Sequence, residues 1–587
     1  MLKILIKKIK IFFIVFILLN NNYFYANTNT NTNTHATIPA PLFETSQRFH
    51  PEIGRNGAVA TQEINATKVG LDILKQGGNA VDAAVAIGYA LAVTLPRAGN
   101  LGGGGFMTIW MQKEQKAYVI NYRETAPEKI DINTITQLYK KDKNSFIYSL
   151  KASGVPGTVS GLNLAAEKFG IKKLSQLIQP AINLASHGIT VTQPLLDSLK
   201  YSEDRLKSDP EANKVFFTSN KLYELNQTFR QPDLANTLKL IAKYGNAGFY
   251  QGRIAKLIEE ANIKQNGYIT QADLLNYKAS LVEPIVANYK NYKIITPPLP
   301  SAGGILLSEQ LNILSKLKVN LPDNNSAEYF HYLTEIMNLT YLDRNTHLGD
   351  SKFGSFDVTK LLSQKHATDL AKKIDPKKHI SFNRVNNSWN EGKNTTHYVV
   401  VDRDLNIVSN TYTLNTTYGS HKIIPGTGFF MNNELDDFTI LLDEPNVYKL
   451  KQGNKNLIAP NKQPLSSMTP TVVISKNNDT PVFATGSPGG SRIITTILQV
   501  ILNIIDYKQD IATAVATPRI HSQNWPDILY YEEGISIDTI EKLQSMGHQV
   551  EKTVAMGSAQ TVYYNSKTHE LYATADPRRA GALAMVY

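Results

Sequence analysis

The order of hydrophobic and polar positions predicts a mainly helical segment over residues 130–380, made of amphipathic runs with polar breaks. A separate helix is predicted from Ala80 to about Val93, where Ala and Val occupy nearly every face. Asn79 is expected to cap its start, with Asp82 near the positive end of the helix dipole. Because this helix is apolar nearly all round, it is expected to be buried on most faces.

Strand patterns lie on both sides of the helical segment. Phe106–Met111 and Ala117–Tyr122 are predicted to pair across a short turn. Beyond residue 394 the pattern becomes β, with predicted strands at Thr396–Val401 and Ile407–Leu414 joined by a short polar loop. Helices and strands together predict a mixed α/β (α+β) fold class.

The second strand pair makes a specific prediction about two threonines. If this hairpin is symmetric about Asp404, Thr395 faces Thr413. Side chains alternate along a strand, so Thr413 and Asn415 point to the same face. A hydroxyl is therefore predicted beside Thr395 and an amide just beyond it, although a slip of one residue would remove both.

Two glycine-rich segments call for different interpretations. Gly99–Gly105 follows a helix and precedes a strand, the reverse of the context for dinucleotide binding, so these glycines are expected to allow close backbone packing. Gly489, Gly490 and Ser491 open a predicted helix with an apolar face. No Gly-Lys-[Ser/Thr] sequence follows, which excludes a Walker-type phosphate loop. Free N–H groups at Gly489 and Gly490 instead predict an oxyanion hole.

Composition adds a prediction about export. The chain has 587 residues, 42% of them apolar, and a formal charge of +11. Four lysines stand before or beside Ile11–Leu19, an apolar run too short to span a membrane, which needs about 20 residues. Residues 1–26 are therefore predicted to be a secretory signal peptide, with an uncleaved interfacial anchor as the alternative. The Asn-Thr repeat makes residues 27–45 a predicted disordered tether, and the mature protein is expected to be periplasmic or secreted.

Missing residue types and motifs exclude several classes of site. The chain has no cysteine, which excludes disulfides, cysteine nucleophiles and thiolate metal sites. It also lacks the H-E-x-x-H zinc motif and the EF-hand calcium loop, so no metal or cofactor is predicted. No basic run is interleaved with aromatic residues, so no nucleic-acid partner is predicted.

The segment Asn394–Tyr398, of sequence Asn-Thr-Thr-His-Tyr, carries the strongest chemical signal. A threonine that becomes an N-terminus carries a hydroxyl nucleophile and a general base, its own freed α-amine, on one residue. Taken alone, Thr395 is more simply a threonine at the start of a strand. With its predicted partner Thr413 and the motifs that follow, the segment instead predicts self-cleavage between Asn394 and Thr395.

Four further motifs follow in order: Thr411–Thr417, Asn432–Phe438, Pro464–Met468 and Thr485–Arg492. With the preceding segment they resemble the small subunit of the γ-glutamyltranspeptidases, also called glutathione hydrolases. The resemblance extends over nearly all of the chain after the leader. It implies the αββα four-layer sandwich of the N-terminal-nucleophile hydrolases, built jointly by two chains cut from one precursor. These would be a large subunit, 46–394, and a small catalytic subunit, 395–587, that remain associated as a heterodimer.

The resemblance also implies residues that hold the substrate α-carboxylate. Arg123 matches the family arginine with this role, and its planar guanidinium suits bidentate carboxylate binding. Ser466 and Ser467 match a serine pair that donates to the same carboxylate. Without the resemblance, a surface ion pair and two turn serines would be the simpler interpretations.

A second group of residues is implied to hold the substrate α-ammonium. Asn415, Glu434 and Asp437 match the family positions with this role, and an ammonium group has three donors and no acceptor. The segment that ends at Tyr448 resembles a lid loop over the glutamyl pocket. Asp576–Arg579 also matches a family segment, but no catalytic role is predicted for it.

The implied reaction cleaves the γ-glutamyl amide of glutathione and related compounds through a γ-glutamyl-threonyl enzyme. Water or an amino acid or dipeptide acceptor would then take the glutamyl group. Two alternatives remain open. A glutaryl or cephalosporin acylase of the same fold would offer no reason for paired acids around an ammonium. A catalytically silent secreted binding protein would keep its chain unprocessed.

Overall fold

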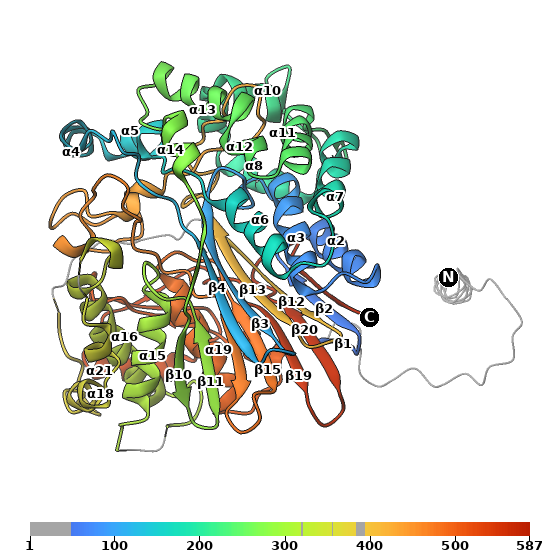
Figure 1. Cartoon of the computed structure of the whole chain (residues 1–587). Coiled ribbons are helices and arrows are strands. Elements are labelled where there is room, and N and C mark those ends of the chain that lie inside the picture. The colour runs from blue at the N-terminus through green and yellow to red at the C-terminus, as the bar shows by residue number, and fades with distance from the viewer. Residues whose placement is uncertain (1–48, 319–320, 355, 383–393) are drawn as a thin grey trace, which may run out of the picture. The chain divides into compact units, whose positions relative to one another are not determined.

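Two seven-stranded antiparallel sheets lie face to face between layers of helices (Figure 1). The computed structural model describes residues 49–318, 321–354, 356–382 and 394–587, which belong to one compact unit, Phe49–Tyr587. The predicted signal peptide and tether lie outside the described residues. The layer order of helix, sheet, sheet and helix confirms the αββα fold class.

Each sheet mixes strands from both sides of residue 394. Sheet 1 has the order β21 (Leu583–Val586), β2 (Gly57–Thr61), β12 (Thr396–Asp402), β13 (Ile407–Thr413), β3 (Gly104–Met111), β4 (Lys116–Tyr122), β9 (Ser280–Val282). Sheet 2 has the order β1 (Glu52–Gly54), β20 (Glu570–Ala575), β19 (Gln560–Asn565), β15 (Pro481–Gly486), β14 (Thr471–Ser475), β11 (Tyr292–Thr296), β10 (Ile285–Tyr289).

The β12–β13 hairpin lies at the centre of sheet 1, between β2 and β3. Thr396 pairs with Tyr412, which is the register that the symmetric hairpin predicts. Every residue of both strands is buried, because sheet 1 is covered on both faces. This register brings Thr395 opposite Thr413 at the end of the hairpin.

The two faces of β12 serve different cores. Val399 and Val401 pack between the sheets with Val472 of β14 and Val562 of β19. Alternate residues point the other way, toward helix α3, and the Tyr398 hydroxyl donates to a backbone carbonyl of that helix. The alternation of side chains along the strand therefore joins the sheet-to-sheet core to the helical layer.

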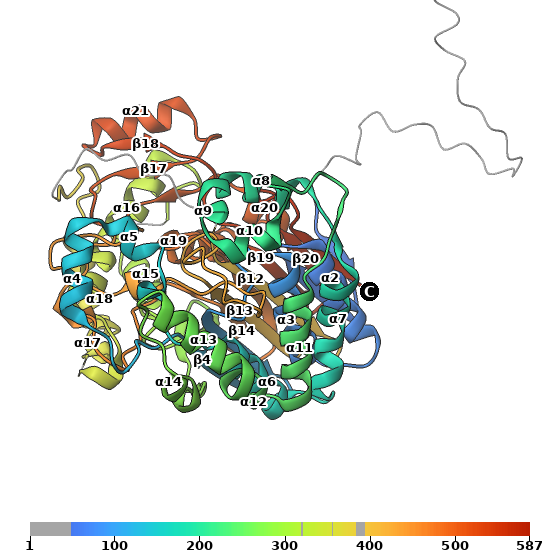
Figure 2. The same cartoon turned by 90° about the horizontal axis from the view of Figure 1, so that it is seen from above.

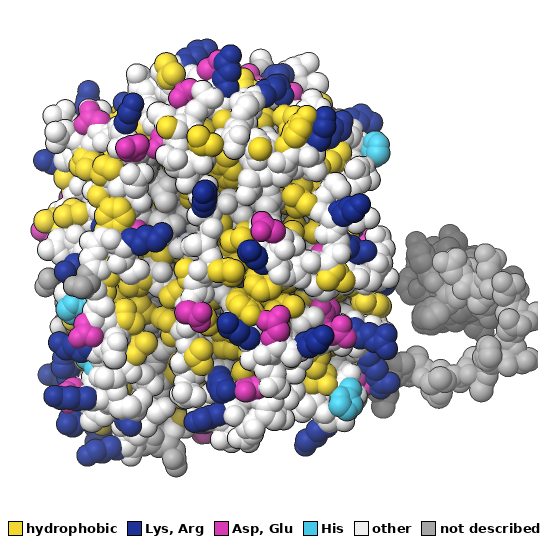
Figure 3. All heavy atoms as spheres, in the orientation of Figure 1, with side chains coloured by type: hydrophobic (Ala, Val, Ile, Leu, Met, Phe, Trp, Pro, Cys, Tyr) yellow, Lys and Arg dark blue, Asp and Glu magenta, His cyan; other side chains and the backbone are white. Residues whose placement is uncertain are grey.

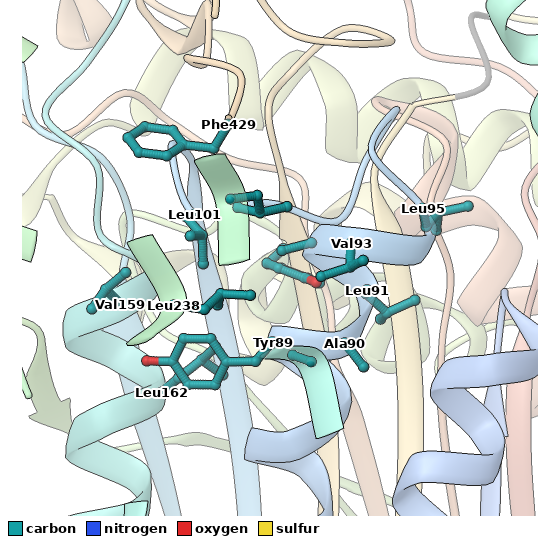
Figure 4. Packing of buried hydrophobic residues seen from close by; sticks show 14 of the residues in the cluster. Tyr89, Ala90, Leu91, Val93, Leu95, Leu101, Val159, Leu162, Leu238 and Phe429 are labelled. Atoms are coloured by element: carbon teal, nitrogen blue, oxygen red, sulfur yellow. The ribbon is translucent and has the colours of Figure 1, made fainter. Parts of the chain in front are cut away.

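Helix α3 (Ala80–Thr94) is buried along its whole length, as predicted. Asn79 and Asp82 form a capping box at its start, which satisfies two otherwise free backbone donors. Figure 4 shows Tyr89 of α3 among the side chains of Leu162 and Leu238 from neighbouring helices. The apolar surface of α3 is thus shared between sheet 1 and a second row of helices.

The larger helices fall into two groups. Those on the side of sheet 1 are α2 (Ile64–Lys75), α3, α6 (Thr158–Phe169), α7 (Leu174–His187), α11 (Pro232–Tyr244) and α13 (Gly252–Lys264). Those on the side of sheet 2 are α15 (Gly303–Leu314), α16 (Ala327–His347), α18 (Gln364–Ala371), α19 (Arg492–Ile505) and α20 (Ile511–Ala516). Shorter helices include α4 (Ile132–Lys141), α5 (Lys143–Ile147), α8 (Gln193–Tyr201), α9 (Glu203–Ser208), α10 (Pro210–Phe216), α12 (Ala247–Tyr250), α14 (Gln271–Asn276) and α17 (Val358–Leu361).

A small three-stranded sheet completes the C-terminal part of the fold. Its strands are β16 (Ile520–His521), β17 (Leu529–Tyr531) and β18 (Val550–Lys552). Helix α21 (Ile537–Ser545) connects the last two strands and lies beside them in Figure 2. This connection allows β17 and β18 to pair in parallel.

The predicted helical segment also contains strands that were not predicted, among them β9, β10 and β11. β10 and β11 have five residues each, and β10 lies at the edge of sheet 2, where alternate residues are partly or fully exposed. β11 is held by pairing with β14, far along the chain. Such short strands depend on tertiary partners more than on local pattern.

Among the described residues, none of the helices has the length and apolarity needed to cross a membrane. On the face shown in Figure 3, basic and acidic side chains are interspersed.

The interleaved sheets predict that two fragments produced by the expected cleavage after Asn394 would stay together. Separating them would break the β2–β12 and β3–β13 ladders and expose the core between the sheets. We expect two bands on a denaturing gel but a single particle containing both fragments in native mass spectrometry. Free fragments under native conditions would contradict this prediction.

Candidate active site

Two threonine hydroxyls face one another at the start of β12. Thr395 Oγ1 lies 2.9 Å from Thr413 Oγ1, and both residues are buried. Thr413 Oγ1 also accepts the backbone N–H of Asn415 at 2.9 Å. The Thr413 hydroxyl is thereby held in place and orients the hydroxyl of Thr395.

The backbone at Thr395 adopts a rare conformation. Its φ angle is +60°, in the left-handed region that a β-branched residue seldom occupies. Such a residue stores roughly 1–3 kcal/mol of strain, which the surrounding structure must hold in place. Breaking the 394–395 peptide bond would release this constraint.

Tyr448 connects the residue before Thr395 to the opposite strand end. Its hydroxyl accepts from Asn394 Nδ2 at 2.6 Å and donates to the backbone carbonyl of Asn415 at 2.5 Å. Its ring lies so close to Gly490 that a Cβ at that glycine would come within 2.4 Å of it. The predicted lid residue therefore contacts three other predicted site residues.

The glycines before α19 adopt positive φ angles, 132° at Gly489 and 54° at Gly490. Neither backbone N–H donates to a protein acceptor within the described residues. Gly490 lines the same cavity as Thr395, whereas Gly489 lies beside it. The free amides of this turn are suited to an oxyanion.

Arg123 is completely buried among acids. Its Nη2 lies 2.7 Å from Asp437 Oδ2, its Nη1 pairs with Glu434, and Glu124 lies 3.5 Å away. Burial raises the pKa of Glu124 to about 7 and also raises the pKa values of Glu434 and Asp437, although the Arg123 charge opposes each shift. The residues predicted to bind a carboxylate and an ammonium thus neutralise one another.

Oxygen acceptors remain available beside this ion cluster. Asn415 Oδ1 and Glu434 Oε2 are buried and accept no hydrogen bond from the described residues. Buried acceptors without donors are costly, by about 1–3 kcal/mol each. Both residues line the cavity, so the arrangement favours a ligand that supplies N–H donors.

Ser466 and Ser467 also line the cavity. Ser466 Oγ accepts the backbone N–H of Met468, and Ser467 Oγ lies 3.5 Å from Nη2 of Arg344 on α16. Burial lowers the pKa of Arg344 to about 10, so its guanidinium stays charged near neutral pH. A second arginine therefore reaches the predicted carboxylate site.

One small cavity, with a water-accessible volume of about 20 Å³, brings most of the predicted residues together. Among the predicted site residues, only Asn394 and Gly489 do not line it. The others do, namely Arg123, Thr395, Thr413, Asn415, Glu434, Asp437, Tyr448, Ser466, Ser467 and Gly490. This convergence of a hydroxyl pair, free amides and buried charges suits acyl transfer from an α-amino acid derivative.

Within the described part of the chain, two other groups of side chains have the composition of metal ligands. His331, Glu335 and His548 form one, and Glu309, Asp343 and His366 form the other. Neither lines the cavity. In the first, His331 bonds directly to His548 at 2.7 Å, so the two nitrogens already satisfy one another.

Comparison with known proteins decides the family. The γ-glutamyltranspeptidase family model matches residues 66–586. The chain belongs to the γ-glutamyltranspeptidase family. It is 41% identical over 544 residues to the glutathione hydrolase proenzyme of Escherichia coli (strain K12), covering 92% of this chain and 93% of that protein. It is 35% identical over 572 residues to the corresponding proenzyme of Bacillus subtilis (strain 168), covering 93% of this chain and 94% of that protein.

Solved structures agree with this family membership. The cephalosporin acylase from Bacillus halodurans superposes with a TM-score of 0.81 at 26% identity, covering 95% of this chain and 99% of that chain. A chain of the Helicobacter pylori γ-glutamyltranspeptidase superposes with a TM-score of 0.51 at 39% identity. It covers 53% of this chain and 90% of its own length.

Arg579, to which the sequence assigned no catalytic role, contacts the predicted cleavage bond. Its Nη1 donates to the backbone carbonyls of Asn394, at 3.3 Å, and Thr395, at 3.4 Å. The Asn394 carbonyl is the one that the Thr395 hydroxyl would attack. No local spacing in the sequence indicates that a C-terminal arginine reaches this bond.

Thr395→Ala should leave one full-length chain, because no hydroxyl remains to attack the Asn394 carbonyl. Intact mass after purification measures both the extent of cleavage and its position. Two fragments of wild-type size from the variant would contradict self-cleavage by Thr395.

Arg579→Ala should slow cleavage by about tenfold to a hundredfold, the range for a lost charge-assisted hydrogen bond of roughly 1.5–3 kcal/mol. The rate can be followed on denaturing gels after synthesis. Arg403→Ala is a matched control, because Arg403 is exposed in the loop of the same hairpin. Equal cleavage rates in the two variants would remove Arg579 from the step.

Proposed function

We propose that the protein is a self-cleaving γ-glutamyltransferase and glutathione hydrolase. One observation carries this function: the Thr395–Thr413 hydroxyl pair opens into the cavity that holds Arg123 with its acids. The names of the relatives, glutathione hydrolase proenzyme, support both the activity and a precursor form.

In the proposed cleavage, Thr395 Oγ attacks the Asn394 carbonyl carbon. The C–O bond forms, the C–N bond breaks, and the hydroxyl proton ends on the released nitrogen. Water then hydrolyses the ester, which leaves a carboxylate on Asn394 and restores the Thr395 hydroxyl. Arg579 faces the oxygen that carries negative charge during the attack.

The new α-amine of Thr395 then serves as the general base. A chain-terminal α-amine has an ordinary pKa of about 7.7–8.0, which allows it to accept the hydroxyl proton near neutral pH. Thr395 Oγ attacks the γ-carbonyl of the substrate, the backbone N–H groups of Gly489 and Gly490 hold the oxyanion, and the leaving amine takes the proton. Water or an acceptor amine then removes the γ-glutamyl group from the ester.

The charged groups on the glutamyl α-carbon would be recognised by replacing ion pairs within the protein with ion pairs between protein and substrate. The substrate carboxylate would pair with Arg123 and accept from Ser466 and Ser467. The substrate ammonium would pair with Asp437 and Glu434 in place of Arg123, and Asn415 Oδ1 would be a further acceptor. A zwitterion carries one charge of each sign, so it can replace the internal ion pairs without leaving a buried charge uncompensated.

The mature form would contain a large subunit, 46–394, and a small subunit, 395–587. The Helicobacter pylori chain that matches 53% of this chain is consistent with a two-chain form. Removal of the signal peptide, residues 1–26, would deliver the heterodimer to the periplasm or the outside. Tyr448 would close over the bound glutamyl group as part of a lid.

Asp437→Asn tests the proposed substrate against the acylase alternative, which the similarity to a cephalosporin acylase keeps relevant. A glutaryl group has no ammonium for Asp437 to bind. Breaking a desolvated charge pair costs about 2–5 kcal/mol, and Glu434 remains, so we expect roughly a thirtyfold loss in kcat/KM for a γ-glutamyl anilide. The matched glutaryl anilide should lose far less.

The control is Asp443→Asn, which removes an exposed carboxylate outside the cavity. Equal losses for the two anilides would mean that Asp437 does not bind the ammonium. A wild-type preference for the glutaryl anilide would replace the proposed function with the acylase.

A further inference from the structure

A second recess lies next to the catalytic cavity, on the other side of Tyr448. It has a water-accessible volume of about 110 Å³, and Tyr148, Arg205, Asn394, His421 and Tyr448 contribute to its walls. Tyr448 lines both spaces, and Asn394 directly precedes the nucleophile. A group bound in this recess would therefore lie beside the reacting bond but outside the glutamyl pocket.

Several polar groups of the recess are buried without a partner. Within the described residues, the Thr417 hydroxyl and Asn394 Oδ1 make no hydrogen bond, and both ring nitrogens of His421 lack a partner at hydrogen-bonding geometry, although the ring interacts with the backbone of Gly419. His421 is only 3% exposed. Burial, reinforced by the Arg205 charge, lowers its pKa to about 3, so the ring is neutral and offers one donor and one acceptor. Together these groups provide donors and acceptors of the kind that a peptide unit needs.

Arg205 adds a positive charge at the rim. Its guanidinium lies 4.0 Å from the centre of the Tyr148 ring, and that ring makes an edge contact with His421. Among the described residues, no carboxylate forms an ion pair with Arg205. A fixed guanidinium without a counter-ion, beside free donors and acceptors, suits a carboxylate attached to a short peptide.

We propose that this recess binds a dipeptide through its C-terminal carboxylate, which pairs with Arg205 while the peptide unit bonds to His421 and Thr417. This inference rests on the proposed function, because it concerns the groups that leave or accept the γ-glutamyl unit. The dipeptide has two sources: the leaving part of glutathione and an acceptor such as glycylglycine. In transfer, the acceptor nitrogen bonds to the glutamyl carbonyl carbon, the bond to Thr395 Oγ breaks, and the acceptor proton returns to Oγ through the α-amine.

The test compares substrates with and without the terminal carboxylate. For the acceptor, a γ-glutamyl anilide is the donor, and glycylglycine is compared with glycylglycinamide. For the leaving group, glutathione is compared with its C-terminal amide. For each enzyme variant, every kcat/KM is divided by the kcat/KM with which the same variant hydrolyses the anilide in the absence of an acceptor.

Arg205→Gln should lower the preference for the free carboxylate by about tenfold, in line with the loss of one charge-assisted hydrogen bond. Arg205→Lys keeps the charge and should retain part of the preference. Arg253→Gln, which removes another exposed arginine of the same helical layer, should retain all of it. A loss with glycylglycine alone assigns the recess to the acceptor, and a loss with glutathione alone assigns it to the leaving group.

Unchanged preference in Arg205→Gln with both substrate pairs would overturn the proposal. An equal loss for acids and amides would also overturn it, because the effect would then be unrelated to the carboxylate. Absence of anilide hydrolysis in the wild type would instead contradict the proposed function, so the two failures are distinguishable.

Discussion

The register of the β12–β13 hairpin is the constraint on which the site depends. Every residue of both strands is buried, so a slip of one residue would turn apolar side chains such as Val399 out of the core between the sheets. The packing that fixes this register also fixes the 2.9 Å contact between the hydroxyls of Thr395 and Thr413. Stability and chemistry are therefore set by the same strand alignment, at the centre of a sheet that neither fragment could complete alone.

The site also depends on a buried cluster of charged side chains whose charges compensate one another. Arg123 is compensated by Asp437, Glu434 and Glu124, and burial raises the pKa values of all three acids. Removing one partner from such a cluster leaves a charge in a low-dielectric environment, which is costly. For the same reason, we expect a zwitterionic amino acid group to fit the cavity better than a singly charged one. The glutaryl group, with a carboxylate alone, would leave the acids without a cation.

Local signals in the sequence predicted the parts of the fold that depend on neighbouring residues. Examples of such parts are the burial and capping of α3, the register of the hairpin and the glycine turn before α19. The strands β10 and β11 were missed because each is short, and their place in sheet 2 depends on the pairing of β11 with β14, far along the chain. Arg344 and Arg579 were missed because their roles arise only when α16 and the C-terminal segment pack against the cavity. Family motifs supplied Arg123 and Asp437, whose pairing no periodicity indicates.

Tyr448 shows how cleavage and substrate access are linked. Its hydroxyl bridges Asn394 and the Asn415 carbonyl, and its ring covers Gly490, one of the two glycines with free amides. It also separates the catalytic cavity from the recess that Arg205 and His421 line. The proposed cut after Asn394 would free the residue that holds this hydroxyl from one side, whereas the bond to the Asn415 carbonyl would remain. The cleavage that we propose to create the α-amine would thus also loosen the side chain lying over the predicted oxyanion hole, so that one bond cleavage would supply both the nucleophile and the room for its substrate.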